Sequence, residues 1–372
     1  MKVERLELSH LKIPLVTPFR TSFGTSHHKD TFLLHLTTDN SEGWAECGAE
    51  AEPFYSAEFL AGAEMVIRDH LLPRILGLGN DLSAEQVSPA LSPVTGHPMA
   101  KHVLETAILD AQLSERGVSF GHYLGAVRER VPAGVSVGIM DSIPELLEAV
   151  GGYLAQGYLR IKLKIEPGWD VEPVRHVREV YGGELLLQVD ANAAYTLADA
   201  RHLATLDTFD LLMIEQPLPA DDLLGHASLA RQIQTPVCLD ESITSARDAA
   251  SAISLGACSI VNIKASRVGG YLEARRIHDV AAAHGVPVWC GGMLETGVGR
   301  APNLALAALP NFVLIGDTSA SSRYFVQDLT APFVLDDGHI AVPDGPGIGV
   351  PVLPDVVQEF TTSRVEMPVE PQ

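Results

Sequence analysis

The chain has 372 residues, of which 46% are hydrophobic and 20% are charged, so it is long enough for two domains with a large buried core. Asp and Glu number 47 against 26 Lys and Arg, and the formal net charge of −21 argues against binding to nucleic acid or to anionic membranes. The first residues carry charges throughout, and no apolar run of about 18 residues appears. The four cysteines form no C-x-x-C pair. These features predict a cytoplasmic protein with reduced thiols.

The first 130 residues are predicted to form one α+β unit. Apolar and polar residues alternate in three segments, as they do in half-buried strands, and two later segments carry apolar residues at helical spacing. The predicted strands span 2–10, 31–38 and 43–50, and the predicted helices span 56–73 and 99–116.

A repeat begins after Pro132. Eight short runs rich in Val, Ile and Leu are separated by helical stretches, and such runs are typical of strands buried on both faces of a parallel sheet. Their spacing of about 25 residues predicts a (β/α)8-type barrel in residues 131–328. An open doubly wound sheet is the alternative, but eight evenly spaced units exceed its usual strand count. The runs begin at Val135, Arg160, Leu185, Leu211, Val237, Ser259, Val286 and Val313.

The segment after the eighth run is irregular. Residues 329–354 contain five prolines, so we do not expect an eighth barrel helix there. We expect residues 329–372 to return to the N-terminal unit and to complete it.

Charged residues close five consecutive runs at equivalent positions. In a barrel of this kind, the carboxyl ends of the strands form the catalytic face. Asp190, Glu215 and Asp240 come from three adjacent runs, so we expect their carboxylates to converge. Three hard oxygen ligands suit Mg²⁺ or Mn²⁺ better than zinc. The alternative is an acidic cluster held by neighbouring lysines as ion pairs.

Lysines close the second and sixth runs. Lys162 and Lys164 are two residues apart and therefore share the interior face, and Lys264 comes from across the barrel. Two neighbouring ammonium groups are expected to lower each other's pKa, which lets one act as a base near pH 7. One lysine would remove the α-proton of a bound carboxylate, another would return it on the opposite face, and a metal would stabilise the enediolate between these steps. The alternative is that the lysines only neutralise the carboxylates.

Five short motifs carry these charges, and they read Lys162-x-Lys164, Asp190-x-Asn192, Glu215-Gln216-Pro217, Asp240-Glu241-Ser242 and Asn262-x-Lys264. Together they resemble the enolase superfamily, muconate-lactonizing subgroup. The resemblance covers nearly the whole chain and implies an α/β fold, a (β/α)7β TIM-like barrel with an N-terminal α+β capping domain. It further implies that Lys164 and Lys264 are the acid/base pair. Asp190, Glu215 and Asp240 would be the ligands for Mg²⁺ (or Mn²⁺, Co²⁺). The supporting residues would be Lys162, Asn192 and Glu241.

Within the subgroup, residues 163–170, 185–200 and 291–300 are similar to the N-acylamino acid racemase / o-succinylbenzoate synthase group. The resemblance implies racemisation of N-acyl (N-succinyl) amino acids, dehydration to o-succinylbenzoate, or both, since both reactions begin with removal of a proton next to a carboxylate. One departure is Ala265-Ser266, where family members often carry Pro-Gly.

Other activities on the same scaffold are a dipeptide epimerase or a muconate-type cycloisomerase. Dipeptide epimerases typically carry Asp-x-Asp after the eighth strand, and Gly316-Asp317-Thr318-Ser319 stands here instead. Sugar-acid dehydratases usually place a His where Lys264 stands. A protein that is not an enzyme is a further alternative, namely a barrel that binds a ligand in a metal-dependent way without catalysis.

Specificity is expected from two loops of the N-terminal unit that close over the barrel mouth in the family. The resemblance also implies a small-molecule carboxylate as substrate and a homo-oligomer, dimer or octamer. The predicted substrate-binding residues are Phe19, Phe23, Tyr55, Ser136, Met293 and Tyr324.

Overall fold

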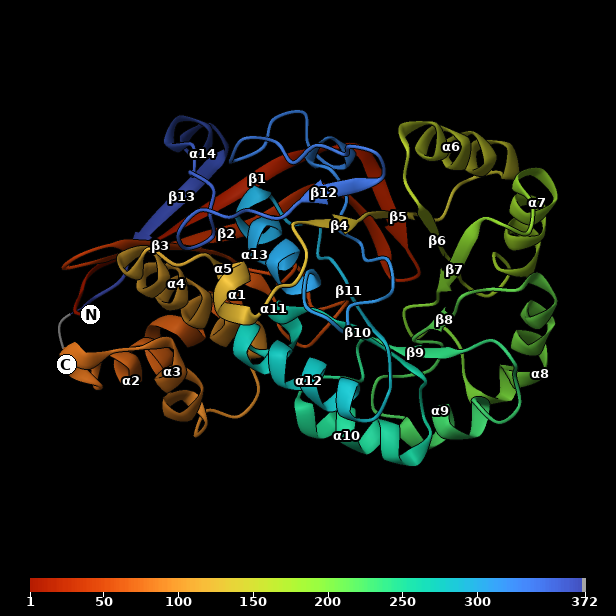
Figure 1. Cartoon of the computed structure of the whole chain (residues 1–372), viewed down its shortest axis with the longest axis horizontal. Coiled ribbons are helices and arrows are strands. Elements are labelled where there is room, and N and C mark those ends of the chain that lie inside the picture. The colour runs from red at the N-terminus through yellow and green to blue at the C-terminus, as the bar shows by residue number, and fades with distance from the viewer. Residues whose placement is uncertain (370–372) are drawn as a thin grey trace.

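The computed structural model describes residues 1–369, and its N-terminal part is built on a four-stranded antiparallel sheet (Figure 1). The strand order is β13-β1-β2-β3, so the last strand of the chain lies beside the first. The strands are β1 (Val3–Thr21), β2 (Gly24–Thr38), β3 (Glu42–Glu46) and β13 (Thr361–Glu366).

The first two strands are much longer than predicted, because they continue beyond the sheet as a hairpin arm that turns at 22–23. Their register shifts between Pro14 and Phe19. Proline lacks the N–H that a ladder needs, so this part of the arm does not show the alternation by which strands are recognised. The third strand ends at Glu46, four residues before its predicted end.

Helices cover this sheet, with α4 packed against β2 and β3. The predicted helix at 99–116 matches α4. Gly117 caps its carboxyl end with a φ of 66°, a left-handed conformation that glycine adopts without strain. The predicted helix at 56–73 begins later, at Leu60, and is interrupted by a π-helical turn, Ile67–Leu71. The helices are α1 (Leu60–Val66), α2 (Leu72–Leu76), α3 (Ala84–Leu91), α4 (Pro98–Arg116) and α5 (Phe120–Leu124).

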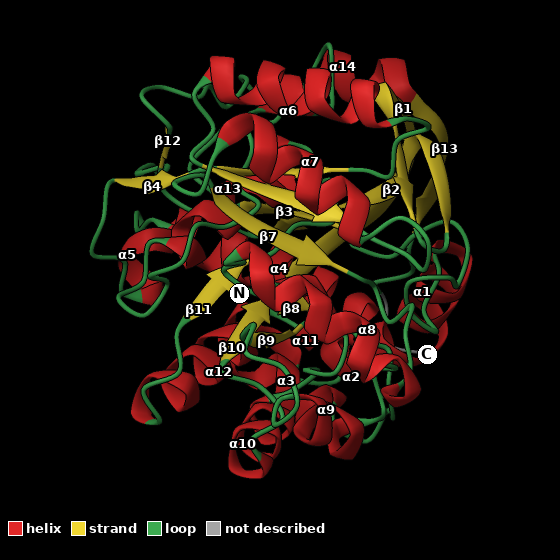
Figure 2. Ribbon diagram, turned by 90° about the vertical axis from the view of Figure 1, so that its right-hand side faces the viewer, coloured by secondary structure: helices red, strands yellow, loops and turns green. Residues whose placement is uncertain are grey.

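The second part is a parallel sheet with the strand order β11-β10-β9-β8-β7-β6-β5. Figure 2 shows its strands surrounded by helices, with α6 and α7 on one side and α9, α10 and α12 on the other. Its elements are β5 (Gly134–Val137), α6 (Ile143–Gln156), β6 (Arg160–Lys164), α7 (Val171–Tyr181), β7 (Leu186–Asp190), α8 (Ala200–Leu203), β8 (Ile214–Glu215), α9 (Leu223–Leu229), β9 (Val237–Leu239), α10 (Ala246–Leu255), β10 (Ile260–Ile263), α11 (Ala265–Val268), α12 (Tyr271–Ala283), β11 (Val288–Cys290) and α13 (Gly297–Ala307). The predicted barrel-type α/β fold is therefore confirmed.

The eighth predicted strand, from Val313, forms only single bridges. Val288 pairs with Phe312 on one side, and Ala133 pairs with Gly316 on the other, so this segment joins β11 to the segment before β5. A Cβ atom at Gly316 would lie 2.7 Å from the carbonyl oxygen of Cys290. The backbone thus passes too close to β11 for a larger residue, and the contact is a close approach rather than a regular ladder.

Two short elements tie the chain beyond residue 328 to earlier segments. β12 (His339–Ala341) pairs with β4 (Arg130–Pro132), and α14 (Pro354–Phe360) leads into β13, which pairs with β1. The limits of the two domains at residues 130 and 328 remain a prediction. No helix within residues 1–369 has the length and apolar character needed to cross a membrane.

A buried carboxylate fastens α4 to two other segments. Asp110 accepts hydrogen bonds from the backbone N–H groups of Trp44 and Ile348, each at 2.7 Å. Asp110→Ala leaves two buried donors unpaired, so we expect the free energy of unfolding to fall by about 2–4 kcal/mol, measured by urea denaturation. Glu115→Ala on the exposed face of the same helix is the control, and an equal effect of both substitutions would contradict the argument.

Candidate active site

Charged side chains gather at the carboxyl ends of the barrel strands. Lys164 pairs with Asp190, and Asp190 pairs with Glu215, in the register of β6, β7 and β8. Asp240 directly follows β9, and Lys264 directly follows β10. Because residues paired across parallel strands face the same side, these groups share the barrel interior. Each of the five is at most 8% exposed.

Lys162 lies at the centre of the acidic groups. Its Nζ is 2.6 Å from Asp317, 3.0 Å from Glu215 and 3.2 Å from Asp190. Burial alone would lower the pKa of Lys162, but these three carboxylates outweigh it and raise the pKa above the usual value. The prediction of a lowered pKa is therefore wrong for Lys162, since carboxylates rather than a second ammonium group surround it.

Lys164 is held by two acceptors at the end of β7. Its Nζ donates to Asp190 Oδ2 and to Asn192 Oδ1, both at 2.6 Å. Asn192 in turn donates to Glu241 Oε1 at 2.9 Å. The two residues predicted to support the site, Asn192 and Glu241, therefore lie in one chain of hydrogen bonds that begins at Lys164.

Lys264 is held from the other side of the barrel. Its Nζ donates to Asp240 Oδ2 at 2.8 Å and to the Tyr55 hydroxyl at 3.0 Å, and it lies 4.6 Å from the centre of the Tyr55 ring. Burial opposes the charged form, but Tyr55 and Glu241 outweigh it and raise the pKa of Lys264. Tyr55 comes from the capping part of the chain, so the cap contributes directly to the geometry of this lysine.

The predicted metal ligands engage these cations in the structure. Within residues 1–369, no three His, Cys, Asp or Glu side chains are arranged as a metal-holding group. The donor chemistry nevertheless fits a divalent cation, because Lys162 already places positive charge between Asp190 and Glu215. Burial, and then the charge of Asp190, raise the pKa of Glu215, so a cation beside these two carboxylates would stabilise their ionised forms. Binding would require the lysines to release carboxylate oxygens.

Backbone strain marks the loops at this face. Asn192, Ala193, Gln216 and Leu294 have φ between 37° and 62°, the left-handed region that L-residues other than Asn and Asp rarely adopt. They follow the strands that carry Asp190 and Glu215 and the turn at Met293. Such strain persists only where surrounding contacts enforce it, and it concentrates at functional sites.

Four of the predicted substrate residues form two aromatic pairs. Phe23 and Tyr55 lie with ring centres 6.3 Å apart, and Phe19 and Tyr324 meet edge to face at 6.5 Å. Ser136 pairs in register with Lys162, and its buried hydroxyl has no hydrogen-bond partner among the described residues.

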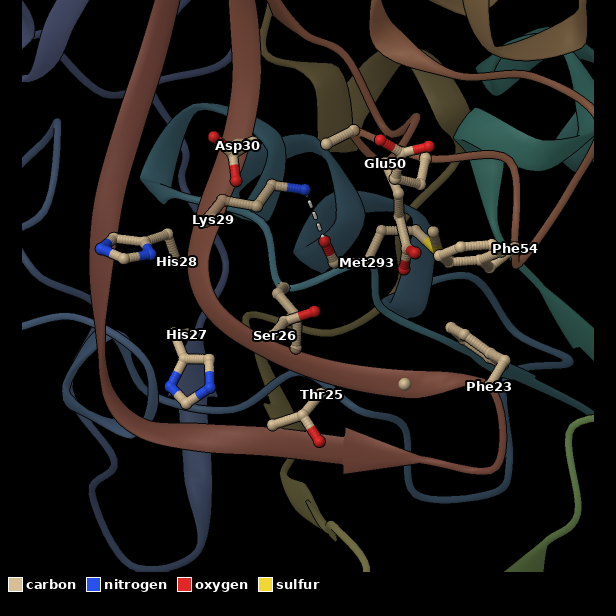
Figure 3. Close-up of a pocket in the computed structure, with 14 residues that line it drawn as sticks. Phe23, Thr25, Ser26, His27, His28, Lys29, Asp30, Glu50, Phe54 and Met293 are labelled. Atoms are coloured by element: carbon tan, nitrogen blue, oxygen red, sulfur yellow. Dashed lines mark hydrogen bonds between the residues drawn. The ribbon is translucent and has the colours of Figure 1, made fainter.

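A cavity of about 280 Å³ adjoins this face, between the hairpin arm, the segment after β3 and the turn at Met293. Figure 3 shows the arm passing around it, with Lys29 reaching toward the Met293 carbonyl and Phe23 lying near Phe54. Two predicted substrate residues, Phe23 and Met293, line this cavity.

Three further charged residues belong to the cluster and were not predicted as site residues. Arg160 donates to Asp317 Oδ1 at 2.8 Å, and Asp317 also holds Lys162. Arg267 on α11 contacts the carboxylate of Asp240. Period two along β6 places Arg160 on the face of Lys162 and Lys164, so the sequence carried a signal for it. Arg267 lies on a short helix of four residues and offers no such signal.

Comparisons with known proteins agree with this geometry. A model described as the mandelate racemase / muconate lactonizing enzyme N-terminal domain matches residues 6–125, and one described as enolase C-terminal domain-like matches residues 145–356. An N-succinylamino acid racemase from an Amycolatopsis species is 61% identical over 365 residues, covering 98% of this chain and 99% of the relative. An o-succinylbenzoate synthase from Geobacillus stearothermophilus is 47% identical, covering 97% and 96%.

Among solved structures, an enolase superfamily member from Listeria innocua superposes with a TM-score of 0.94 and 39% identity, covering 100% of both chains. The resemblance that the strand-end motifs indicated is confirmed over both parts of the chain. This chain is an enzyme that belongs to the enolase superfamily, with a mandelate racemase / muconate lactonizing enzyme N-terminal domain and an enolase-like C-terminal domain.

Proposed function

We propose that this enzyme racemises N-acylamino acids, N-succinyl derivatives included, and that dehydration to o-succinylbenzoate is a second reaction of the same site. The observation that carries the proposal is the placement of the two lysines. Lys164 ends β6 and Lys264 follows β10, and these strands are four positions apart in the strand order of the barrel sheet. Two ammonium groups on opposite sides of a barrel can reach opposite faces of one α-carbon. The names of the 61% and 47% identical relatives support both reactions.

In the proposed reaction, the lysine that acts as the base carries a neutral amine, and its Nζ takes the proton as the Cα–H bond of the substrate breaks. The other lysine delivers a proton from its own Nζ to the opposite face, and the configuration inverts. Asn192 orients Lys164, and Tyr55 orients Lys264, through the hydrogen bonds described above. Dehydration begins with the same proton abstraction, after which the C–O bond at the neighbouring carbon breaks and the leaving hydroxide takes the proton held by the lysine, so that water departs.

We propose that Asp190, Glu215 and Asp240 hold Mg²⁺, or Mn²⁺ or Co²⁺. When bound, such a cation supplies positive charge that stabilises the negative charge developing on the substrate carboxylate. Lys162 lies between Asp190 and Glu215, and we propose that its ammonium group binds the same substrate carboxylate. Asn262, which donates to Glu215 Oε1 at 2.7 Å, fixes the orientation of that carboxylate.

The dipeptide epimerase alternative is less well supported. The single Asp after the eighth run, Asp317, is occupied by Arg160 and Lys162, and the Ser319 hydroxyl donates to the Gly134 carbonyl at 2.9 Å. Neither group is available to receive the free ammonium group of a dipeptide. An epimerase from Bacillus subtilis is 26% identical to this chain, against 61% for the racemase.

An NMR assay in D₂O with Mg²⁺ tests the proposal. N-acetyl- and N-succinyl-amino acids of both hands, and the o-succinylbenzoate precursor, are offered separately. We expect exchange of the Cα proton together with loss of optical rotation for the N-acylamino acids. Conversion of the precursor without Cα exchange would instead identify a dedicated synthase, and no reaction with any of these substrates would overturn the assignment.

We further propose that the protein is cytoplasmic and assembles as a homo-oligomer, a dimer or an octamer. We also propose that residues 1–130, completed by residues 329–372, form the capping domain over a catalytic domain of residues 131–328. Sedimentation of the purified protein tests the assembly.

A further inference from the structure

The cavity beside the reaction centre is built from two contrasting kinds of wall. Phe23, Phe54, Met293 and Leu294 give it apolar surface, and Phe54 is 65% exposed at its rim. Glu50 and Glu52, from the segment after β3, give it acidic surface. A cavity of this kind suits a side chain with a methylene stem and a cationic end, because the stem packs against apolar surface while the charge meets an acid.

Glu50 is the acid that faces the reaction centre. Burial raises the pKa of its carboxyl group, and the charges of Lys29, Lys264 and Lys164 oppose that rise, so its carboxylate lies within electrostatic reach of both proposed acid/base lysines. Within residues 1–369, its carboxylate makes no hydrogen bond or ion pair, although its backbone carbonyl accepts from Leu60 N–H at 2.9 Å. Glu50 is half-buried, and an acid in this position gains from a ligand that supplies a partner.

The cation nearest to this acid already has other partners. Lys29 Nζ donates to the Met293 carbonyl at 2.8 Å and lies 4.0 Å from Glu46 Oε1. Its ammonium group is therefore directed at Met293 and Glu46 and makes no hydrogen bond to Glu50. The remaining formal charges of the lining are the carboxylates of Asp30, Glu50 and Glu52, with His27 and His28 exposed on the arm.

We propose that this cavity receives the amino-acid side chain of the substrate and that Glu50 makes the enzyme selective for cationic side chains of the lysine and arginine type. The inference rests on the proposed racemase function, which places a substrate α-carbon between Lys164 and Lys264. The cavity is linked to that position through Phe23, whose ring centre lies 6.3 Å from that of Tyr55, the hydrogen-bond partner of Lys264.

Matched substrates test the inference. N-succinyl-arginine is compared with N-succinyl-citrulline, which has nearly the same shape without the charge, and N-succinyl-lysine is compared with N-succinyl-norleucine. We expect kcat/KM to be about tenfold or more higher for each charged substrate, as for a partly desolvated ion pair. In Glu50→Gln, which keeps the size of the side chain, we expect both ratios to fall to about one.

Glu52→Gln is the control, because Glu52 lies two residues away in the same cavity but is exposed, so solvent screens its charge. We expect this variant to keep most of the preference for cationic substrates. A ratio near one in the unaltered enzyme, or a ratio that Glu50→Gln does not change, overturns the role of Glu50. Failure of all N-succinyl substrates to exchange the Cα proton would instead overturn the racemase function itself.

Discussion

In D₂O, Lys164→Ala is expected to abolish exchange of the α-proton from one enantiomer of an N-acylamino acid and to spare exchange from the other. Lys264→Ala should show the opposite preference, because the two ammonium groups reach the substrate from opposite sides of the barrel. Loss of a positioned acid or base lowers the rate about 10²–10⁴-fold, so racemisation should fall by at least this factor in both variants. Proton NMR of each pure enantiomer measures the exchange directly.

Two controls separate chemistry from folding. Removing Lys164 leaves Asp190 with one fewer buried partner, which itself destabilises the barrel. Lys164→Met preserves the length of the side chain, and circular dichroism reports whether either variant folds. Lys12→Ala, on the exposed face of β1, should leave exchange from both enantiomers intact. Full racemisation in either lysine variant would rule out a mechanism with two bases.

Removal of divalent cations is the second change with a large expected effect. Dialysis against EDTA should abolish turnover, and Mg²⁺, Mn²⁺ or Co²⁺ should restore it, because a cation held by Asp190, Glu215 and Asp240 would stabilise the charge that develops on the substrate carboxylate. Undiminished turnover by the metal-free protein would show that the acidic cluster only forms ion pairs with the lysines.

Thermal unfolding provides a readout that does not depend on activity. A cation that binds only the folded chain stabilises it by about 2.7 kcal/mol at a hundred times its Kd, which raises Tm by several degrees. The rise should disappear in Glu215→Gln and Asp240→Asn. Glu42→Gln, an exposed position in β3, serves as the control and should keep the rise.

The barrel could be predicted because each of its repeating units satisfies the same physical requirement. A strand buried on both faces needs a short apolar run, and the crossover helix needs about a dozen residues, so the period of about 25 appears in the sequence itself. The charges at Asp190, Glu215 and Lys264 interrupt these runs at one register, and this made them candidates. The eighth run was predicted as a strand but forms only single bridges, because a close approach at Gly316 replaces its ladder.

Pairing between charges could not be predicted from the sequence. A strand pattern gives the face on which Lys162 lies, but not that Asp317, from the last of the eight runs, is its nearest partner at 2.6 Å. The expected effect of one lysine on the other was wrong for this reason, since pKa depends on all charges nearby in space. Glu50 also gave no signal, because a single acid in a loop acquires meaning only beside the cavity that it lines.

The pairing of β13 with β1 has a consequence for how the protein is made. Glu7 lies opposite Glu366, so all the barrel strands leave the ribosome after the first partner of this ladder and before the second. The barrel strands emerge between them and can associate while the first sheet still has an open edge. Contacts between such distant residues form slowly because a long loop must close first. We therefore expect the N-terminal sheet to be completed after the barrel strands, and a nascent chain to acquire turnover only after β13 has been released.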